Sequence, residues 1–165
     1  MRVKTKWPKL VEDLFDEVLV DRGFKRLPLA TAEGRRFLAW ERDAGWKFDV
    51  VDLADMKWAE YSAGAEVSVS LPDWHDGYRI GVDGWTTLWL ARRQPGWYRA
   101  GDPSIITEVH ADLLASVKWF DERYGTPEQM LEMLQPSVER SGCNVGTEPH
   151  LRIQKMLEDR VRKGK

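Results

Sequence analysis

The first clear pattern along the chain is a stripe of apolar residues with helical spacing. Six residues recur at steps that place them on one side of a helix: Leu10, Val11, Leu14, Phe15, Val18 and Leu19. Pro8 stands where a first helical turn tolerates proline, and Gly23 follows Arg22 as a left-handed C-cap. The pattern predicts an amphipathic helix from Pro8 to Arg22.

Period-two alternation replaces the helical spacing in the next block. Residues 37–42 and 46–50 alternate in this way, and residues 43–45 between them favour a tight turn, so the two runs predict a β-hairpin. Residues 66–71 predict a third strand. Its strict alternation of apolar and polar side chains is typical of a sheet with one solvated face.

Glycine and proline interrupt residues 72–103, so we expect most of this stretch to be loop. Within it, residues 85–90 give the one convincing strand pattern. Helical spacing returns over residues 104–124, where Asp102 is the expected N-cap and Gly125 ends the helix.

Two shorter helical segments are expected after Gly125. Residues 126–129 have the form of a capping box, and the helix that starts there is expected to end at Pro136. Residues 137–147 form a polar linker, and residues 151–161 are mildly amphipathic and strongly charged.

This order of elements indicates an α+β domain. We expect an antiparallel sheet of four or five strands, packed by an N-terminal helix and two or three C-terminal helices. The single domain covers residues 1–136, and the linker and charged helix of residues 137–165 are appended to it.

Composition narrows the class of protein. The chain has 165 residues, one cysteine and a net charge of −2, which argues against a disulfide framework and a general polyanion binder. It contains no apolar run long enough to cross a membrane and no signal peptide. We therefore expect a soluble, cytoplasmic protein without a membrane partner.

Charge is unevenly distributed along the chain. Residues 1–9 and 150–165 are basic, whereas the body between them carries 15 basic and 25 acidic residues. Such a body favours docking of a basic protein. A nucleic-acid contact through the basic ends is less favoured.

Residues that bind metals or act as nucleophiles are present without a supporting motif. His75, His110 and His150 lack metal-ligand spacing, and Cys143 has no marked partner. Phosphate-binding loops and nucleophile elbows are also missing. We expect no metal, no cofactor and no catalytic residue of these kinds.

Carboxylates leave a second interpretation open. A pair of them can act as general acid and base, although strand-edge and loop aspartates more often form turns or guard edges. The candidates lie near the hairpin and in the glycine-rich loops: Asp49, Asp52, Asp55, Asp73, Asp76 and Asp83.

The chain has nine tryptophans, and aromatic residues interleave with arginine between residues 74 and 99. This composition is typical of protein interfaces and of stacking platforms. Trp85 and Trp89 fit either the core or such a surface. The expected binding residues are Trp74, Tyr78, Arg79, Trp97, Tyr98 and Arg99.

Short motifs spread over residues 7–136 give the chain a resemblance to a known family. They are Arg22-Gly23-Phe24-Lys25-Arg26, Phe37 with Trp40-Glu41-Arg42, Val67-Ser68-Val69, and Trp119-Phe120 before Gly125-Thr126-Pro127-Glu128. In these the chain resembles the bacterial domain of unknown function 4304. The resemblance implies a small cytoplasmic α+β domain and no established catalytic residues.

We therefore expect a non-enzymatic module that binds another protein, an immunity-type inhibitor of a toxin being one specific form. The alternative is a hydrolase of a glycan or nucleotide that uses tryptophan stacking and two of Asp49, Asp52, Asp73 and Asp83. A carboxylate pair with a raised pKa in a cleft favours the enzyme, whereas an exposed flat surface favours the binding module.

Overall fold

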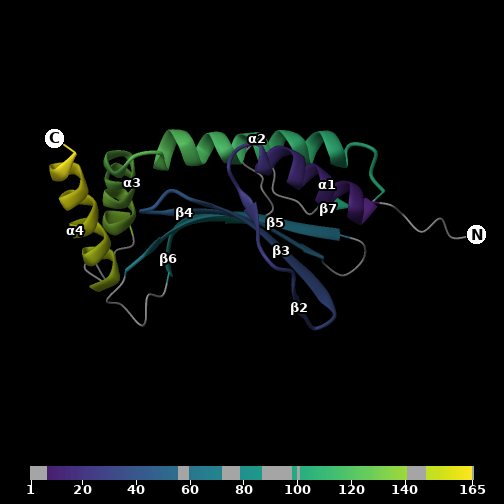
Figure 1. Cartoon of the computed structure of the whole chain (residues 1–165), viewed down its shortest axis with the longest axis horizontal. Helices are drawn as coiled ribbons and strands as arrows, with labels where there is room; N and C mark the ends of the chain where they lie inside the picture. The colour runs from purple at the N-terminus through teal and green to yellow at the C-terminus, as the bar shows by residue number, and fades with distance from the viewer. Residues whose placement is uncertain are drawn as a thin grey trace, which may run out of the picture.

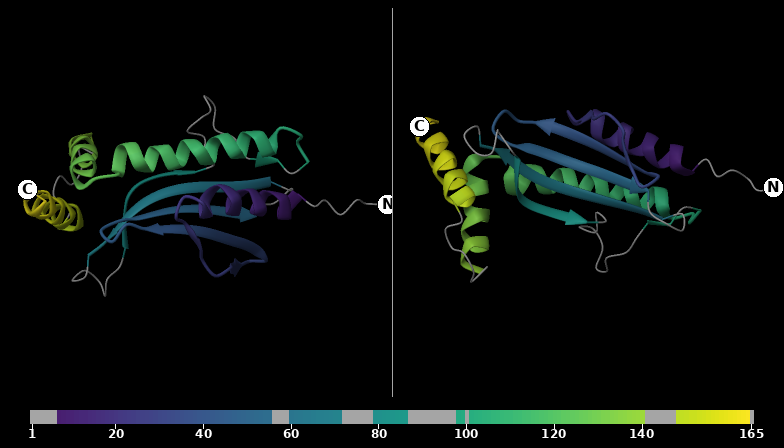
Figure 2. Two further views of the ribbon diagram at one scale, coloured as in Figure 1. Left: turned by 45° about the horizontal axis from the view of Figure 1, so that its top comes forward. Right: turned by 90° about the horizontal axis from the view of Figure 1, so that it is seen from below.

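A computed structural model describes residues 7–55, 60–71, 79–86, 98–99, 101–140 and 148–164. An antiparallel sheet carries two helices along one face, and two further helices stand at one end of it (Figures 1 and 2). The elements are α1 (Trp7–Val20), β1 (Lys25–Arg26), β2 (Ala30–Ala32), β3 (Arg35–Asp43), β4 (Phe48–Asp55), β5 (Glu60–Ser70), β6 (Arg79–Thr86), β7 (Tyr98–Arg99), α2 (Ile105–Tyr124), α3 (Pro127–Arg140) and α4 (Glu148–Lys163).

The sheet has the order β1-β3-β4-β5-β6, and every pairing is antiparallel. Two short strands complete it, because β2 also pairs with β3 and β7 pairs with the start of β5. The predicted α+β class is confirmed. Among the described helices, none is long and apolar enough to cross a bilayer.

One face of the sheet forms the core with α1 and α2 (Figure 1). Trp40 and Val51 are register partners on this face and both are fully buried. The ring of Phe15, from α1, lies 4.9 Å from the ring of Trp40. The indole N–H of Trp40 donates to Asp16 Oδ1 at 2.8 Å, which satisfies the polar end of a buried side chain.

The end of α1 follows the predicted capping chemistry. Gly23 has φ of +85°, a conformation that side-chain-bearing residues rarely adopt. The amide of Phe24 donates back to the carbonyl of Leu19 at 3.1 Å, and the Phe24 ring is buried. This is the left-handed C-cap that the sequence predicts.

The predicted hairpin and third strand are confirmed by β3, β4 and β5, but the last long strand lies earlier than expected. β6 spans Arg79–Thr86 and contains Gly81 and Gly84. Residues 87–90 of the predicted strand lie outside the described residues. Pairing with β5 supplies the ladder of hydrogen bonds, and this tertiary contribution outweighs the poor strand propensity of glycine.

The start of α2 differs slightly from the prediction. The first helical residue is Ile105, and Asp102 caps the preceding turn, where its Oδ1 accepts from the amide of Ser104 at 3.0 Å. The helix ends before Gly125, as predicted.

The C-terminal helices depart more from the sequence pattern. The capping box at Thr126 and Gln129 is confirmed by reciprocal hydrogen bonds of 3.0 and 3.2 Å. The prediction that Pro136 ends this helix is wrong, because α3 continues to Arg140. Helix α4 packs against α3 and contributes Ile153 and Leu157, both fully buried, to the same core as the sheet. This packing offsets the hydrogen bond that a proline removes from a helix.

Candidate functional site

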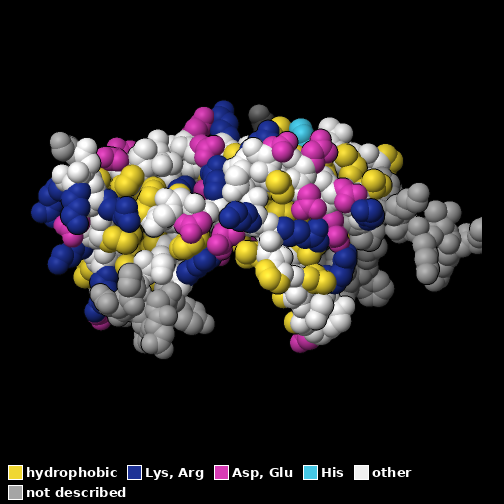
Figure 3. All heavy atoms as spheres, in the orientation of Figure 1, with side chains coloured by type: hydrophobic (Ala, Val, Ile, Leu, Met, Phe, Trp, Pro, Cys, Tyr) yellow, Lys and Arg dark blue, Asp and Glu magenta, His cyan; other side chains and the backbone are white. Residues whose placement is uncertain are grey.

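The face of the sheet opposite α1 and α2 is open over the described part of the chain. Figure 2, right, looks onto this face with α2 behind the strands, and the space-filling view is hollowed beneath the sheet beside β2 and β3 (Figure 3). Because side chains alternate along a strand, residues of opposite parity to the core line this face. They are Phe37, Ala39, Glu41, Phe48, Val50, Asp52, Ala54, Ser62 and Glu66.

An arginine spans one end of the open face. Arg79, from β6, places its guanidinium 3.6 Å from the centroid of the Phe48 ring on β4. The same guanidinium forms an ion pair with both carboxylate oxygens of Glu41 on β3. The side chain therefore crosses β5 and β4 and links the two outer long strands of the sheet. This face thus already contains one arginine that stacks on an aromatic ring and binds a carboxylate.

Two carboxylates lie beside the contact of Arg79 with Phe48 and Glu41, which we call the arginine clamp, and no described residue supplies them with a cation. Asp52 on β4 is opposite Gly64, and Glu66 on β5 is opposite Val50, so the two acids are diagonal neighbours on one face. A Cβ at Gly81 would approach Glu66 Oε1 to 3.2 Å, so this glycine leaves room for the carboxylate. Among the described residues, neither Asp52 nor Glu66 forms an ion pair.

The environment changes the acidity of Asp52. The pKa of its carboxyl is raised to about 6, first by loss of hydration between the strands and second by the negative charge of Glu66. A backbone hydrogen bond from Gly64 acts in the opposite direction. The residue nevertheless keeps contact with solvent on the open face. A carboxyl with this pKa titrates close to neutral pH, where a small change in its surroundings alters its charge.

Asp49, another of the expected candidates, has a different environment. It is fully buried and accepts from Lys47 Nζ at 2.8 Å and from Arg42 at 2.7 and 2.9 Å. Arg42 also bonds Asp121 of α2 at 2.7 Å. Burial lowers the pKa of Lys47, whereas for Arg42 the hydrogen bonds to Asp49 and Asp121 outweigh burial and raise the pKa. Asp49 is thus bound to two cations inside the protein and is not accessible to a ligand.

Of the six expected binding residues, the structure describes Arg79, Tyr98 and Arg99, and these three do not share one surface. Arg79 is paired with Ser70 at one end of β5, whereas Arg99 is paired with Glu60 at the other end. At about 3.3 Å per residue these two positions are roughly 33 Å apart. Tyr98 is 2% exposed and its hydroxyl donates to Asp112, so its ring belongs to the core.

Several other expected residues fall outside the described part of the chain. These are Trp74, Tyr78, Trp89, Trp97, Asp73, Asp76, His75 and Cys143. For Asp83 and Trp85 the backbone is described within β6, opposite Val67 and Ala65. No group of three or more metal-ligating side chains occurs among the residues that the structure describes.

Glu41 and Glu66 are functional candidates that sequence reasoning missed. Glu66 lies on the polar side of a predicted strand, which is also where a solvated residue is expected. Glu41 lies on a partly apolar side of the predicted hairpin, shared with Phe37 and Ala39. Only the register of β3, β4 and β5 brings them next to Asp52. No family model, no curated protein and no solved structure matches the chain. Function must therefore be inferred from the geometry of the chain itself.

Proposed function

We propose that the protein is a binding module whose open sheet face accepts a cationic segment of another protein. The observation that carries this proposal is the pair of carboxylates at Asp52 and Glu66, for which no described residue supplies a cation. Like charges in neighbouring positions of adjacent strands destabilise a sheet. A lysine or arginine from a partner, placed between them, relieves this repulsion and gains two charge-assisted hydrogen bonds.

The arginine clamp supports this proposal because it is an internal example of the same recognition. Arg79 binds Glu41 and stacks on Phe48 on the same face. Phe37, which is 40% exposed, and the half-buried Val50 supply apolar area beside the carboxylate pair. A central charged contact surrounded by apolar area is typical of protein interfaces.

The identity of the partner is a finer part of the proposal. An acidic surface suits a protein whose own active site is basic, such as an enzyme that cleaves nucleic acid. The specific form that we propose is an immunity-type role, by analogy with acidic inhibitors of toxins that cleave nucleic acid. The resemblance in sequence implies only the setting, a bacterial cytoplasm.

The test is a titration with a soluble octapeptide in which arginine and threonine alternate, followed by calorimetry. We expect Asp52→Asn/Glu66→Gln to weaken binding at least about tenfold, since each charged hydrogen bond contributes about 1.5–3 kcal/mol. Binding to the unsubstituted protein should weaken as the pH falls through about 6, because protonation of Asp52 removes one of the two charges.

The matched control is Glu122→Gln/Glu132→Gln, which removes the same charge from exposed positions on α2 and α3. A loss of less than about twofold is expected there, because long-range charge effects are screened by salt. Equal losses in the two double variants, or no binding of the peptide at all, would contradict the proposal.

The raised pKa of Asp52 also favours a second candidate, a hydrolase with Asp52 as general acid and Glu66 as base. Against it, both side chains of the pair are exposed among the described residues, whereas catalysis of this kind favours an enclosed cleft from which water is excluded. A hydrolase predicts cleavage of nitrophenyl glycosides or nucleotides with an optimum near pH 6 that both Asp52→Asn and Glu66→Gln abolish. A binding module predicts no such activity.

A further inference from the structure

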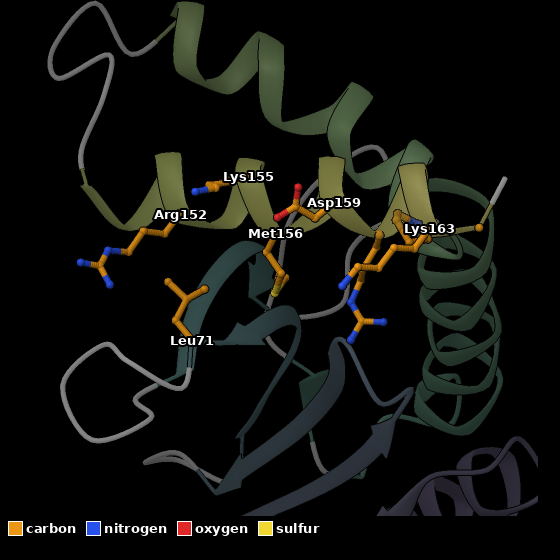
Figure 4. Close-up of a pocket in the computed structure, with 9 residues that line it drawn as sticks. Leu71, Arg152, Lys155, Met156, Asp159 and Lys163 are labelled. Atoms are coloured by element: carbon orange, nitrogen blue, oxygen red, sulfur yellow. The ribbon is translucent and has the colours of Figure 1, made fainter.

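A second surface feature lies at the end of the sheet where β5 finishes, roughly 17 Å along the strand direction from Glu66. It is an open groove of about 920 Å³ between α4, the start of α3 and the end of β5 (Figure 4). Its volume is within the range of about 300–1,000 Å³ that small-molecule sites occupy. The lining residues are Leu71, Pro127, Arg152, Lys155, Met156, Asp159, Arg160, Lys163 and Gly164.

The groove is strongly cationic. Arg152, Lys155, Arg160 and Lys163 line it, against one acid, Asp159. They form a stripe along α4 that is about 16 Å long at 1.5 Å per residue. Lys and Arg side chains also gather over the α4 end of the molecule in the space-filling view (Figure 3).

Most of this positive charge is not neutralised within the described part of the chain. Arg152 pairs with Glu148 at 2.6 Å, and Asp159 is engaged by Arg162, which does not line the groove. Lys155, Arg160 and Lys163 have no ion pair with any described residue.

A purely structural explanation covers only part of this charge. Cations in a last helical turn stabilise the negative end of the helix dipole, which accounts for Arg160 and Lys163. Lys155 lies in the first half of α4, outside the reach of that effect. In addition α3 begins at Pro127, on the groove wall, so the positive end of its dipole adds to the field.

The groove also has an apolar floor. Met156 points from α4 toward Leu71 at the end of β5, with Arg152 on one side and Lys163 on the other (Figure 4). A ligand that fits this arrangement combines several negative charges with an apolar or ring-shaped part. Phosphate groups suit the cations, because Arg and Lys bind phosphate oxygens strongly.

We propose that this groove binds a small molecule with two or three phosphate groups next to an apolar or ring-shaped part, the chemical class of a nucleoside triphosphate. The phosphates lie on Lys155, Arg160 and Lys163, and the ring lies on Leu71 and Met156. The site is separate from the open sheet face and does not depend on the function proposed for that face.

The experiment is calorimetric titration of the full chain with ATP, tripolyphosphate, adenosine and a twelve-nucleotide single strand. We expect ATP to bind more tightly than tripolyphosphate, and adenosine to bind least. Lys155→Glu/Arg160→Glu should weaken ATP binding at least about tenfold, because it reverses the charge of two exposed cations that line the groove.

The control is Lys118→Glu/Arg123→Glu, which reverses two exposed cations on α2 outside the groove and should change ATP affinity less than about twofold. Thermal melting of both double variants establishes that they fold. Absence of ATP binding, equal losses in the two double variants, or binding of the oligonucleotide alone would overturn the proposal. Substitution of Asp52 and Glu66 should leave ATP binding unchanged, so the two proposals can fail separately.

Discussion

Lys47, Asp49 and Arg42 show how one carboxylate can hold two cations in the interior. Asp49 and Lys47 are 0% and 3% exposed, and the three side chains are joined by hydrogen bonds of 2.7–2.9 Å. The open face has the opposite arrangement, since no described residue gives Asp52 or Glu66 an ion-pair partner. The buried charge of Asp49 is therefore compensated within the chain, whereas the two carboxylates of the open face are in contact with solvent.

Removal of the shared carboxylate is expected to be severe. Asp49→Ala leaves Lys47 buried beside Arg42 without a counter-charge, and it should lower the free energy of unfolding by about 3–5 kcal/mol. The measurement is urea unfolding at pH 7. A double variant, Lys47→Met/Asp49→Ala, should recover about half of this loss, because the unpaired lysine is gone. If the double variant were less stable than Asp49→Ala, charge burial would not be the cause.

Asp52 makes the opposite prediction. Its folded-state pKa of about 6 lies above the ordinary value of 3.8, so the folded chain binds more protons than the unfolded chain between these pH values. The contribution of this group to stability is present below about pH 4 and is lost as the pH rises through about 6. Asp52→Asn should therefore raise the melting temperature at pH 8 by about 2–4 °C, an estimate reduced for solvent screening.

Thermal melts at pH 8 and pH 4 measure this effect, and the gain should disappear at the lower pH. Glu132→Gln, which neutralises an exposed acid on α3, serves as the control and should give no comparable difference. A gain of equal size at both pH values would point to a cause other than the charge of Asp52.

At the scale of the elements, local signals in the sequence predicted the part of the fold that local chemistry determines. Three predicted features each depend on only a few neighbouring residues. They are the helix capped by Gly23, the hairpin around residues 43–45 and the capping box at Thr126. β6 and the part of α3 beyond Pro136 depend instead on pairing and packing with distant segments. The glycines of β6 lower its strand propensity and Pro136 lowers the helix propensity of α3, so the sequence alone predicts neither. The tertiary contacts of these segments determine their secondary structure.

Substitutions in helix α4 test how much its tertiary contacts stabilise the fold. Its charge pattern led us to expect an appended segment, whereas Ile153 and Leu157 are fully buried. Ile153→Ala and Leu157→Ala should each lower the free energy of unfolding by about 2–5 kcal/mol. Leu151→Ala on the same helix, where the side chain is 53% exposed, should change it by less than about 0.5 kcal/mol. Denaturant unfolding of the three variants separates a packed helix from one that is merely attached, for which all three changes would be small.

At the scale of the whole molecule, the candidate site could be predicted only in part. Asp52 and Arg79 stood among the residues expected to act, from the spacing of the aspartates and from the composition of the aromatic segment. Their neighbours Glu41 and Glu66 could not be assigned, because strand register joins positions 25 residues apart in sequence. The separation of Arg79 from Arg99 has the same origin, since both pair with β5 but at opposite ends.

The arginine clamp has a consequence for the rate and cost of association. Arg79 joins β6 to β3 across two intervening strands, so one side chain connects the two outer long strands of the open face. A face whose shape is set in advance loses little conformational entropy when a partner arrives. For the binding function proposed above, the contact of Arg79 with Glu41 and Phe48 is already formed in the folded chain, so we expect a complex to form without rearrangement of these strands.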